Sequence, residues 1–176
     1  MTIIGQDRPG LVESIANVVA DRGGNWLESR MSRLGGQFAG ILRVEVPVEE
    51  ESALVRALEA LTQKGLSVVV HPDQLQGDAG LRKLCLLEIV GQDRPGIVRQ
   101  ISHALAERAV NVEELNTERS SAAMSGESLF RAQARLSLPE TCSLDEIRRQ
   151  LERIAEDLIV EVSLEELPSP EKEPVG

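Results

Sequence analysis

The sequence predicts an α+β protein in which one small unit of strands and helices is repeated along 176 residues. Three observations lead to this prediction. The hexapeptide GQDRPG occurs at 5–10 and again, unchanged, at 91–96. Each copy is followed by the same helical stripe of apolar residues, and later by a strand that alternates apolar and polar residues. We therefore expect two domains of about 80 residues each, a length at which small domains fold.

The first predicted element of each domain is a strand that ends at the hexapeptide. It is plain in the second copy, where LRKLCLLEIV precedes Gly91. In the first copy only the residues from Met1 to Ile4 precede the hexapeptide. This difference predicts either a shortened edge strand in the first domain or a chain that has lost several N-terminal residues.

The hexapeptide itself predicts the start of a helix. Asp7 and Asp93 are candidate N-caps, and Pro9 and Pro95 suit the first helical turn, where a missing N–H costs nothing. Each helix is expected to bury one stripe, formed by Leu11, Val12, Ile15, Val18 and Val19 in the first copy and by Ile97, Val98, Ile101, Ala104 and Leu105 in the second.

Two strands follow each helix. Asn25 and Asn111 begin the first of them, and the pair Gly35–Gly36 predicts a tight hairpin turn in the first copy. In the second copy the segment SSAAMSGES predicts a longer, mobile loop. The next strand should bury Phe38, Gly40, Leu42, Val44 and Val46 in the first copy, and Phe130, Ala132, Ala134, Leu136 and Leu138 in the second.

A second helix and a last strand complete each unit. Ser143 and Glu146 form a capping-box pattern before the second helix of the second copy. The last strands are LSVVV from Leu66 and LIVEVSL from Leu158. The order β-α-β-β-α-β is that of the ferredoxin-like fold, with four antiparallel strands and two helices on one face. We expect domains at 1–71 and 81–164, a linker at 72–80 and a disordered tail at 165–176.

Composition and charge exclude several classes of function. Lys and Arg number 19 against 29 Asp and Glu, a net charge of −10 that opposes direct binding to nucleic acid or anionic membranes. Trp26, Phe38 and Phe130 are too few to form a base-stacking sheet. Cys85 and Cys142 stand too far apart in the sequence to suggest a disulfide framework or a metal site.

The sequence also lacks the constellations that catalysis requires. It shows no nucleophile with a base, no carboxylate dyad and no metal cluster, so we expect neither an enzyme nor a cofactor. It contains no apolar run of membrane-spanning length and no signal-peptide pattern, which indicates a cytoplasmic protein.

The hexapeptide has two interpretations. Uncapped amides and the helix dipole favour a carboxylate or phosphate beside the turn. The same residues also make a good helix start with no further role, because helix caps far outnumber anion sites. Asn25 and Asn111 are likewise either ligand contacts or ordinary turn residues after a helix. Arg8 and Arg94 are either ligand contacts or solvated side chains in salt bridges.

A βαββαβ unit that opens with G-x-D-R-P-G-[IL]-V, and whose second strand begins with Asn, resembles an ACT domain. The resemblance covers roughly Met1 to Leu164. ACT domains are small regulatory modules that bind amino acids between two domains. The tandem arrangement resembles transcriptional repressors of the glycine cleavage system. By position, the resemblance implies these ligand-binding residues: Gly5, Gln6, Asp7, Arg8, Gly10, Asn25, Gly91, Gln92, Asp93, Arg94, Gly96 and Asn111.

In such a site the turn amides receive the carboxylate of the effector, and the Asn or Asp side chain meets its ammonium group. The resemblance implies a non-catalytic, dimeric regulator that binds a small amino acid, glycine or serine-like, and controls a protein partner such as a transcription activator. The alternative is a ligand-free interaction module or regulatory subunit of a metabolic enzyme. Arg131, Gln133 and Arg135 are candidate partner contacts, although a solvated sheet face explains them equally well.

Overall fold

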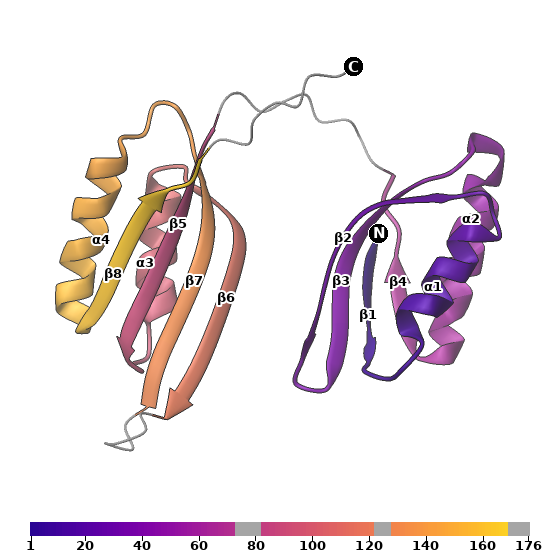
Figure 1. Ribbon diagram of the computed structural model, residues 1–176, viewed down its shortest axis with the longest axis horizontal. Coiled ribbons are helices and arrows are strands. Elements are labelled where there is room, and N and C mark those ends of the chain that lie inside the picture. The colour runs from indigo at the N-terminus through magenta and orange to yellow at the C-terminus, as the bar shows by residue number, and fades with distance from the viewer. Residues whose placement is uncertain (73–81, 122–127, 169–176) are drawn as a thin grey trace. The chain divides into compact units, whose positions relative to one another are not determined.

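The structure is a computed structural model that describes residues 1–72, 82–121 and 128–168 (Figure 1). The chain divides into two compact units, Met1–Leu75 and Gln76–Gly176. Most of the predicted linker, the centre of the second hairpin loop and the end of the predicted tail lie outside the described residues. In the part of the chain that is described, no helix is long and apolar enough to cross a membrane.

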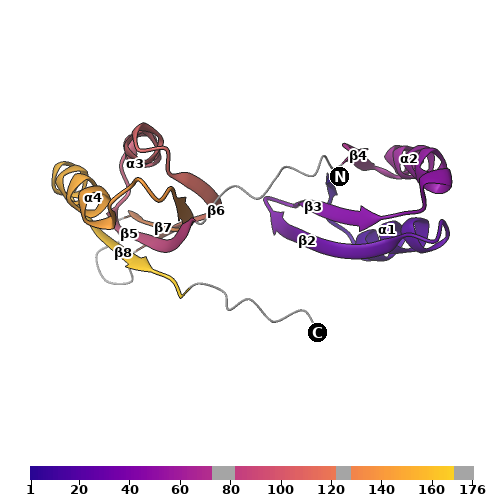
Figure 2. The same cartoon turned by 90° about the horizontal axis from the view of Figure 1, so that it is seen from above.

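Unit 1 is a four-stranded antiparallel sheet in the order β2-β3-β1-β4, with its helices on one face (Figures 1 and 2). Its elements are β1 (Thr2–Gln6), α1 (Leu11–Ala20), β2 (Asn25–Leu34), β3 (Gln37–Glu45), the 3-10 turn η1 (Val48–Glu50), α2 (Glu51–Glu59), η2 (Ala60–Lys64) and β4 (Leu66–Val69).

Unit 2 repeats this arrangement with the strand order β6-β7-β5-β8. Its elements are β5 (Lys83–Gln92), α3 (Ile97–Glu107), β6 (Asn111–Ser121), β7 (Ser128–Leu138), α4 (Leu144–Leu158) and β8 (Val160–Glu166). The predicted α+β fold, two ferredoxin-like βαββαβ units, is therefore confirmed. Strand β8 runs two residues past the expected boundary at 164 because Leu87 to Cys85 continue to pair with Leu164 to Glu166.

The predicted apolar stripes form the cores, with one correction. In α1, Leu11, Ile15 and Val19 are buried, and the equivalent stripe of α3 is buried too. Val12 and Val98 were expected in these stripes, but they are 47% and 45% exposed. Each lies one residue, about 100°, round the helix from the first buried residue and so faces away from the sheet.

The position of the first strand in unit 1 also differs from the expectation. Strand β1 is shorter than β5, with 5 residues against 10. It is nevertheless central and not an edge strand, because it pairs with β3 on one side and with β4 on the other. The edges of the two sheets are β2 and β4, and β6 and β8. Strand β1 pairs with β3 from Gln37 to Ile41.

The turns and caps follow the sequence in part. Gly35 and Gly36 form the predicted hairpin turn, with φ of 59° and 79°. Ser143 is the N-cap of α4, but its side chain makes no capping hydrogen bond. The carboxylate of Glu146 instead accepts a hydrogen bond from Arg108 Nη1 at 3.0 Å. The last strand of unit 2 begins at Val160 and not at Leu158, which still belongs to α4.

Candidate functional site

Each hexapeptide connects the first strand of its unit to the first helix. The N-caps are Gly10 and Gly96, with φ of 86° and 97°. The prediction that Asp7 and Asp93 are the caps is therefore wrong, and both prolines precede the cap instead of lying in the first helical turn. The physical reason is that the turn enters the helix through a left-handed residue, a conformation that glycine adopts without cost.

The two aspartates form matching ion pairs instead. Arg33 Nε lies 2.6 Å from Asp7 Oδ2 in unit 1. Arg119 Nε lies 2.9 Å from Asp93 Oδ2 in unit 2. The aspartates are about one-third exposed, and the arginines about two-thirds exposed. Each turn thus presents a guanidinium group beside the start of a helix.

Sequence reasoning missed Arg33 and Arg119, although a signal was present. Both lie near the end of the second strand of their unit, and the interval between them equals the interval between Asp7 and Asp93. A charged pair that recurs at the repeat spacing indicates a shared contact. The signal was weak because the two partners of each pair are far apart in the sequence.

Backbone hydrogen bonds hold the same turns against the hairpins. The N–H of Asp7 donates to the carbonyl of Gly36 at 2.9 Å. The N–H of Asp93 donates to the carbonyl of Ser128 at 2.8 Å. The main chain and the side chain of each aspartate therefore fix the turn to the strand pair beside it.

Gly5 and Gly91 have a packing role that the sequence did not reveal. The resemblance implied only ligand contact at these positions, and neither glycine has a positive φ. A Cβ atom on Gly5 would lie 2.6 Å from the Gly65 carbonyl oxygen, and one on Gly91 would lie 2.7 Å from Val160 Cα. The close approach is thus made within the same unit, at the start of β4 for Gly5 and at the start of β8 for Gly91.

The other hexapeptide side chains differ between the two copies. Arg8 donates from Nη2 to the carbonyl of Lys64 at 2.6 Å, which ties the turn to the end of η2. Arg94 donates to the Gln92 side chain at 3.1 Å and stays within its own turn. Gln6 and Gln92 are exposed last residues of their strands.

Asn25 and Asn111 begin β2 and β6 as predicted, and both are exposed. Within unit 1, however, the turn and the asparagine lie at opposite ends of the nine-residue strand β3. Gln6 pairs with the first residue of that strand, and Asn25 pairs with the last. At about 3.4 Å per residue, this separation is roughly 27 Å. One unit therefore cannot bring its turn and its asparagine to the same small ligand.

The helix starts differ in charge. Helix α1 has an acidic residue in its first turn, Glu13, whereas α3 has none. A Cβ atom on Gly10 would lie 3.8 Å from Glu13 Oε2, so this carboxylate lies over the start of α1. Arg99 occupies the equivalent position in α3. The helix start in unit 2 is therefore the more favourable place for an anion.

Two further observations concern the space beside α3 and metal binding. A mainly apolar cavity of about 40 Å³ lies beside α3, lined by residues that include Ile97, Val98 and Leu115. It has room for about one water molecule, too little for an amino acid. Among the described residues, no group of three or more His, Cys, Asp and Glu side chains is arranged to hold a metal ion.

Comparisons with known proteins agree with this architecture. Residues 1–71 match the family model described as ACT domain. A crystal structure of an unknown protein from Galdieria sulphuraria is 29% identical, with a TM-score of 0.80, and the match covers 95% of this chain and 96% of that chain. No curated protein sequence matches the chain at a significant level.

A second solved structure is that of a protein provisionally assigned as a glycine cleavage system transcriptional repressor. It is 18% identical, with a TM-score of 0.69, and the match covers 96% of this chain and 95% of that chain. At this identity the likeness shows the shared fold. The resemblance to ACT domains is therefore confirmed for residues 1–71, which match that family model, and unit 2 repeats the same βαββαβ fold.

Proposed function

We propose that the chain is a non-catalytic regulatory protein that binds a small amino acid, glycine or serine-like, through its hexapeptide turns. In this proposal the bound state is passed to a protein partner that controls transcription in glycine or one-carbon metabolism. The ACT match and the fold shared with the glycine cleavage repressor support it. The observation that carries it is the recurrence, in both units, of a helix start without a side-chain cap beside an arginine.

The chemistry of these turns suits one end of a zwitterion. The first amides of α1 and α3 receive no capping bond from Gly10 or Gly96, which have no side chain. Free helical amides and the positive end of the helix dipole favour a carboxylate. Arg33 and Arg119, which pair with Asp7 and Asp93 of the same turns, add guanidinium charge that also favours a carboxylate. The ammonium end then needs an acceptor, and the amide oxygens of Asn25 and Asn111 are the candidates.

The edge strands offer a way to bring these groups together. Strands β2 and β6 are sheet edges of 10 and 11 residues, and β6 is exposed along its whole length. If the same edge strand of two copies of the chain pairs in antiparallel fashion, the start of each lies beside the end of the other. With β2, Asn25 of one copy would approach the turn of Asp7 and Arg33 of the other. With β6, Asn111 of one copy would approach the turn of Asp93 and Arg119 of the other.

A thermal-shift panel of amino acids on the full chain tests the proposal. A free ligand at 100 times its Kd stabilises a protein by about 2.7 kcal/mol, which raises Tm by several degrees. We expect one small amino acid to give this shift, and Arg119→Ala to remove most of it. Arg153→Ala, on the exposed outer side of α4, is the matched control and should respond like wild type.

The alternative function, a ligand-free interaction module, is favoured by one observation. Asp7 and Asp93 already have partners, so neither carboxylate is available to an ammonium group unless an arginine moves away. A flat panel, together with a stable oligomer, would support this alternative and contradict the amino-acid sensor.

A further inference from the structure

Unit 2 has a shallow groove of about 760 Å³ where α4 ends and β8 begins. We call it the α4–β8 groove and define it by five residues that line it: Glu152, Glu156, Ile159, Val160 and Glu161. Figure 1 shows the start of β8 beside the last turn of α4, at one edge of the sheet. Gly91 also lines the groove, but Asp93 and Gly96 do not, so the groove is distinct from the start of α3.

Ile159 joins α4 to β8 in a conformation that suits glycine. Its φ is 56°, in the left-handed region that β-branched residues rarely adopt. The strand pairing makes Gly65 its counterpart in unit 1, where φ is 78°. The isoleucine side chain is 61% exposed. Packing within unit 2 therefore gives little reason for an isoleucine here, whereas contact with another molecule does.

The end of α4 also lacks the cations that unit 1 has at the equivalent place. The last carbonyls of a helix carry partial negative charge and favour a cation. Lys64 lies in the last turn of η2, and Arg8 donates from Nη2 to its carbonyl at 2.6 Å. The last turn of α4 has no basic residue, and Arg94, the counterpart of Arg8, bonds to Gln92 instead. The described residues of unit 2 thus leave this helix end without the cations found in unit 1.

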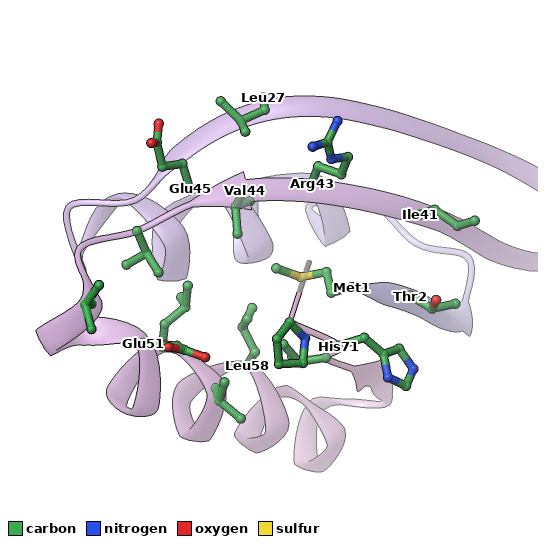
Figure 3. Close-up of a pocket in the computed structure, with 16 residues that line it drawn as sticks. Met1, Thr2, Leu27, Ile41, Arg43, Val44, Glu45, Glu51, Leu58 and His71 are labelled. Carbon is green, nitrogen blue, oxygen red and sulfur yellow. The ribbon is translucent and has the colours of Figure 1, made fainter. Parts of the chain in front are cut away.

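The charges that line the groove have one sign. Its titratable residues are the three glutamates, which are all exposed. Among the described residues, none of the three is in an ion pair, and no Lys, Arg or His lines the groove. The hollow of unit 1 in Figure 3 differs, because Arg43 and His71 line it together with Glu45 and Glu51. The α4–β8 groove is therefore complementary to a cation.

We propose that the α4–β8 groove binds a segment of a partner protein that carries an arginine or lysine beside an apolar side chain. The cation lies against the glutamates at the end of α4, and the apolar side chain covers Ile159. The guanidinium group of Arg8 at the end of η2 is the example of the first contact within this chain. This inference does not depend on an amino-acid effector, so the thermal-shift panel can fail without affecting it.

Fluorescence anisotropy on the full chain tests the proposal with the labelled peptide GRLVRG, a short basic and apolar segment. We expect saturable binding in the micromolar range that weakens as salt is added, because the glutamates are exposed. The control peptide GELVEG reverses the charge, and GRSSRG removes the apolar side chains. Each should bind roughly tenfold more weakly. No saturable binding by GRLVRG, or equal binding by either control peptide, would overturn the proposal.

Two charge-matched variants distinguish the groove from the acidic surface as a whole. Glu161→Lys and Glu140→Lys change the net charge of the chain equally, and both residues are exposed, but only Glu161 lines the groove. We expect Glu161→Lys to weaken binding of GRLVRG several-fold and Glu140→Lys to leave it unchanged. Circular dichroism checks that both variants are folded. Equal weakening by the two variants would show that the peptide responds to overall charge, which contradicts a site in the groove.

Ile159→Gly separates partner contact from packing. Glycine adopts a φ of 56° without strain, so the Tm of the variant should rise. Binding of GRLVRG should nevertheless weaken several-fold, while the weak binding of GRSSRG should not change. A residue with a structural role alone would not lower affinity when its replacement stabilises the unit. Wild-type affinity for GRLVRG, or a fall in Tm, would contradict the contact proposed for Ile159.

Discussion

The two glycines of each hexapeptide serve different physical purposes, and substitution separates them. Gly96 has a φ of 97°, and a Cβ atom on it would make only an ordinary contact, 3.9 Å from Gln100 Nε2, whereas Gly91 has no room for a Cβ atom beside Val160. We expect Gly96→Ala to lower the free energy of unfolding by about 1–2 kcal/mol, the cost of a left-handed residue. Gly91→Ala should cost more, because the backbone of β8 must move. Urea denaturation measures both.

Gly23→Ala is the matched control for that comparison. Gly23 has a φ of 64° and no atom within 4 Å of a Cβ placed on it, so it tests torsion without contact. We expect Gly23→Ala to lower the free energy of unfolding by about as much as Gly96→Ala does. If Gly91→Ala lowers the free energy of unfolding by no more than Gly23→Ala does, strand packing at the hexapeptide tolerates a methyl group.

Glu13 should make the two helix starts bind an anion unequally. A charge at a helix terminus contributes about 0.3–1 kcal/mol, or a factor of roughly two to five in affinity. We expect glycine or serine to perturb the Gly96 amide resonance at lower concentration than the Gly10 resonance. Glu13→Gln should bring the two responding concentrations closer together. Arg99→Glu should weaken the response of the Gly96 resonance. NMR titration measures each turn separately; equal responses in wild type would contradict the prediction.

The buried thiol of Cys85 should make stability depend on alkaline pH. Burial raises the pKa of the Cys85 thiol, and the carboxylate of Glu166 raises it further, while Lys83 and Arg148 act in the opposite direction. The folded state then holds the thiol proton more tightly than the unfolded state does. This contribution is complete below the unfolded thiol pKa of about 8.5 and is lost as pH rises through the folded value.

The measurement is thermal unfolding between pH 7 and pH 10. Wild type should lose Tm more steeply above about pH 8.5 than Cys85→Ala does, although the variant starts from a lower Tm because of its cavity. Parallel Tm profiles for the two proteins would show that the thiol does not titrate differently on folding.

At the scale of elements, the sequence was most informative where a pattern repeated. The alternation from Phe130 to Leu138 fixed β7, and the paired glycines fixed the first hairpin turn. Helix stripes were predicted well except at Val12 and Val98, because adjacency to a buried residue does not determine which way a side chain faces. Local patterns thus determined the elements and most of their buried faces.

The local sequence patterns did not predict the contacts between elements. The central place of β1 follows from the strand order of the whole sheet, not from the length of the strand. The cap position depends on the torsion of Gly10, which the letters Asp-Arg-Pro-Gly do not distinguish from a cap at Asp7. Arg33 reaches Asp7 only because β2 returns beside the turn. The sequence therefore located the turns but not the arginines that pair with their aspartates.

At the scale of the whole molecule, the long exposed edges determine how a second sheet can join. An uncovered edge strand pairs readily with another strand, and natural proteins protect such edges unless they use them. Strands β2 and β6 also carry exposed apolar side chains, Leu27 and Leu115, each 49% exposed. Antiparallel pairing of one of these edges between two copies of the chain is the association that the proposed function requires, because it brings the turn of one copy to the asparagine of the other.

Sedimentation of edge variants tests this association between copies. We expect the wild-type chain to show a concentration-dependent mass that rises towards a dimer, and Leu115→Lys to shift it towards the monomer, because a charge would lie against the joining strand. The Tm of the variant at low concentration should stay near that of wild type, since the side chain is half exposed in the unit itself. Val48→Lys is the control, because Val48 is 84% exposed and lies on η1, which is not a strand of either sheet. If Leu115→Lys dimerises like wild type while the control also does so, β6 is not the joining edge between copies, and Asn111 has no role in a site between copies.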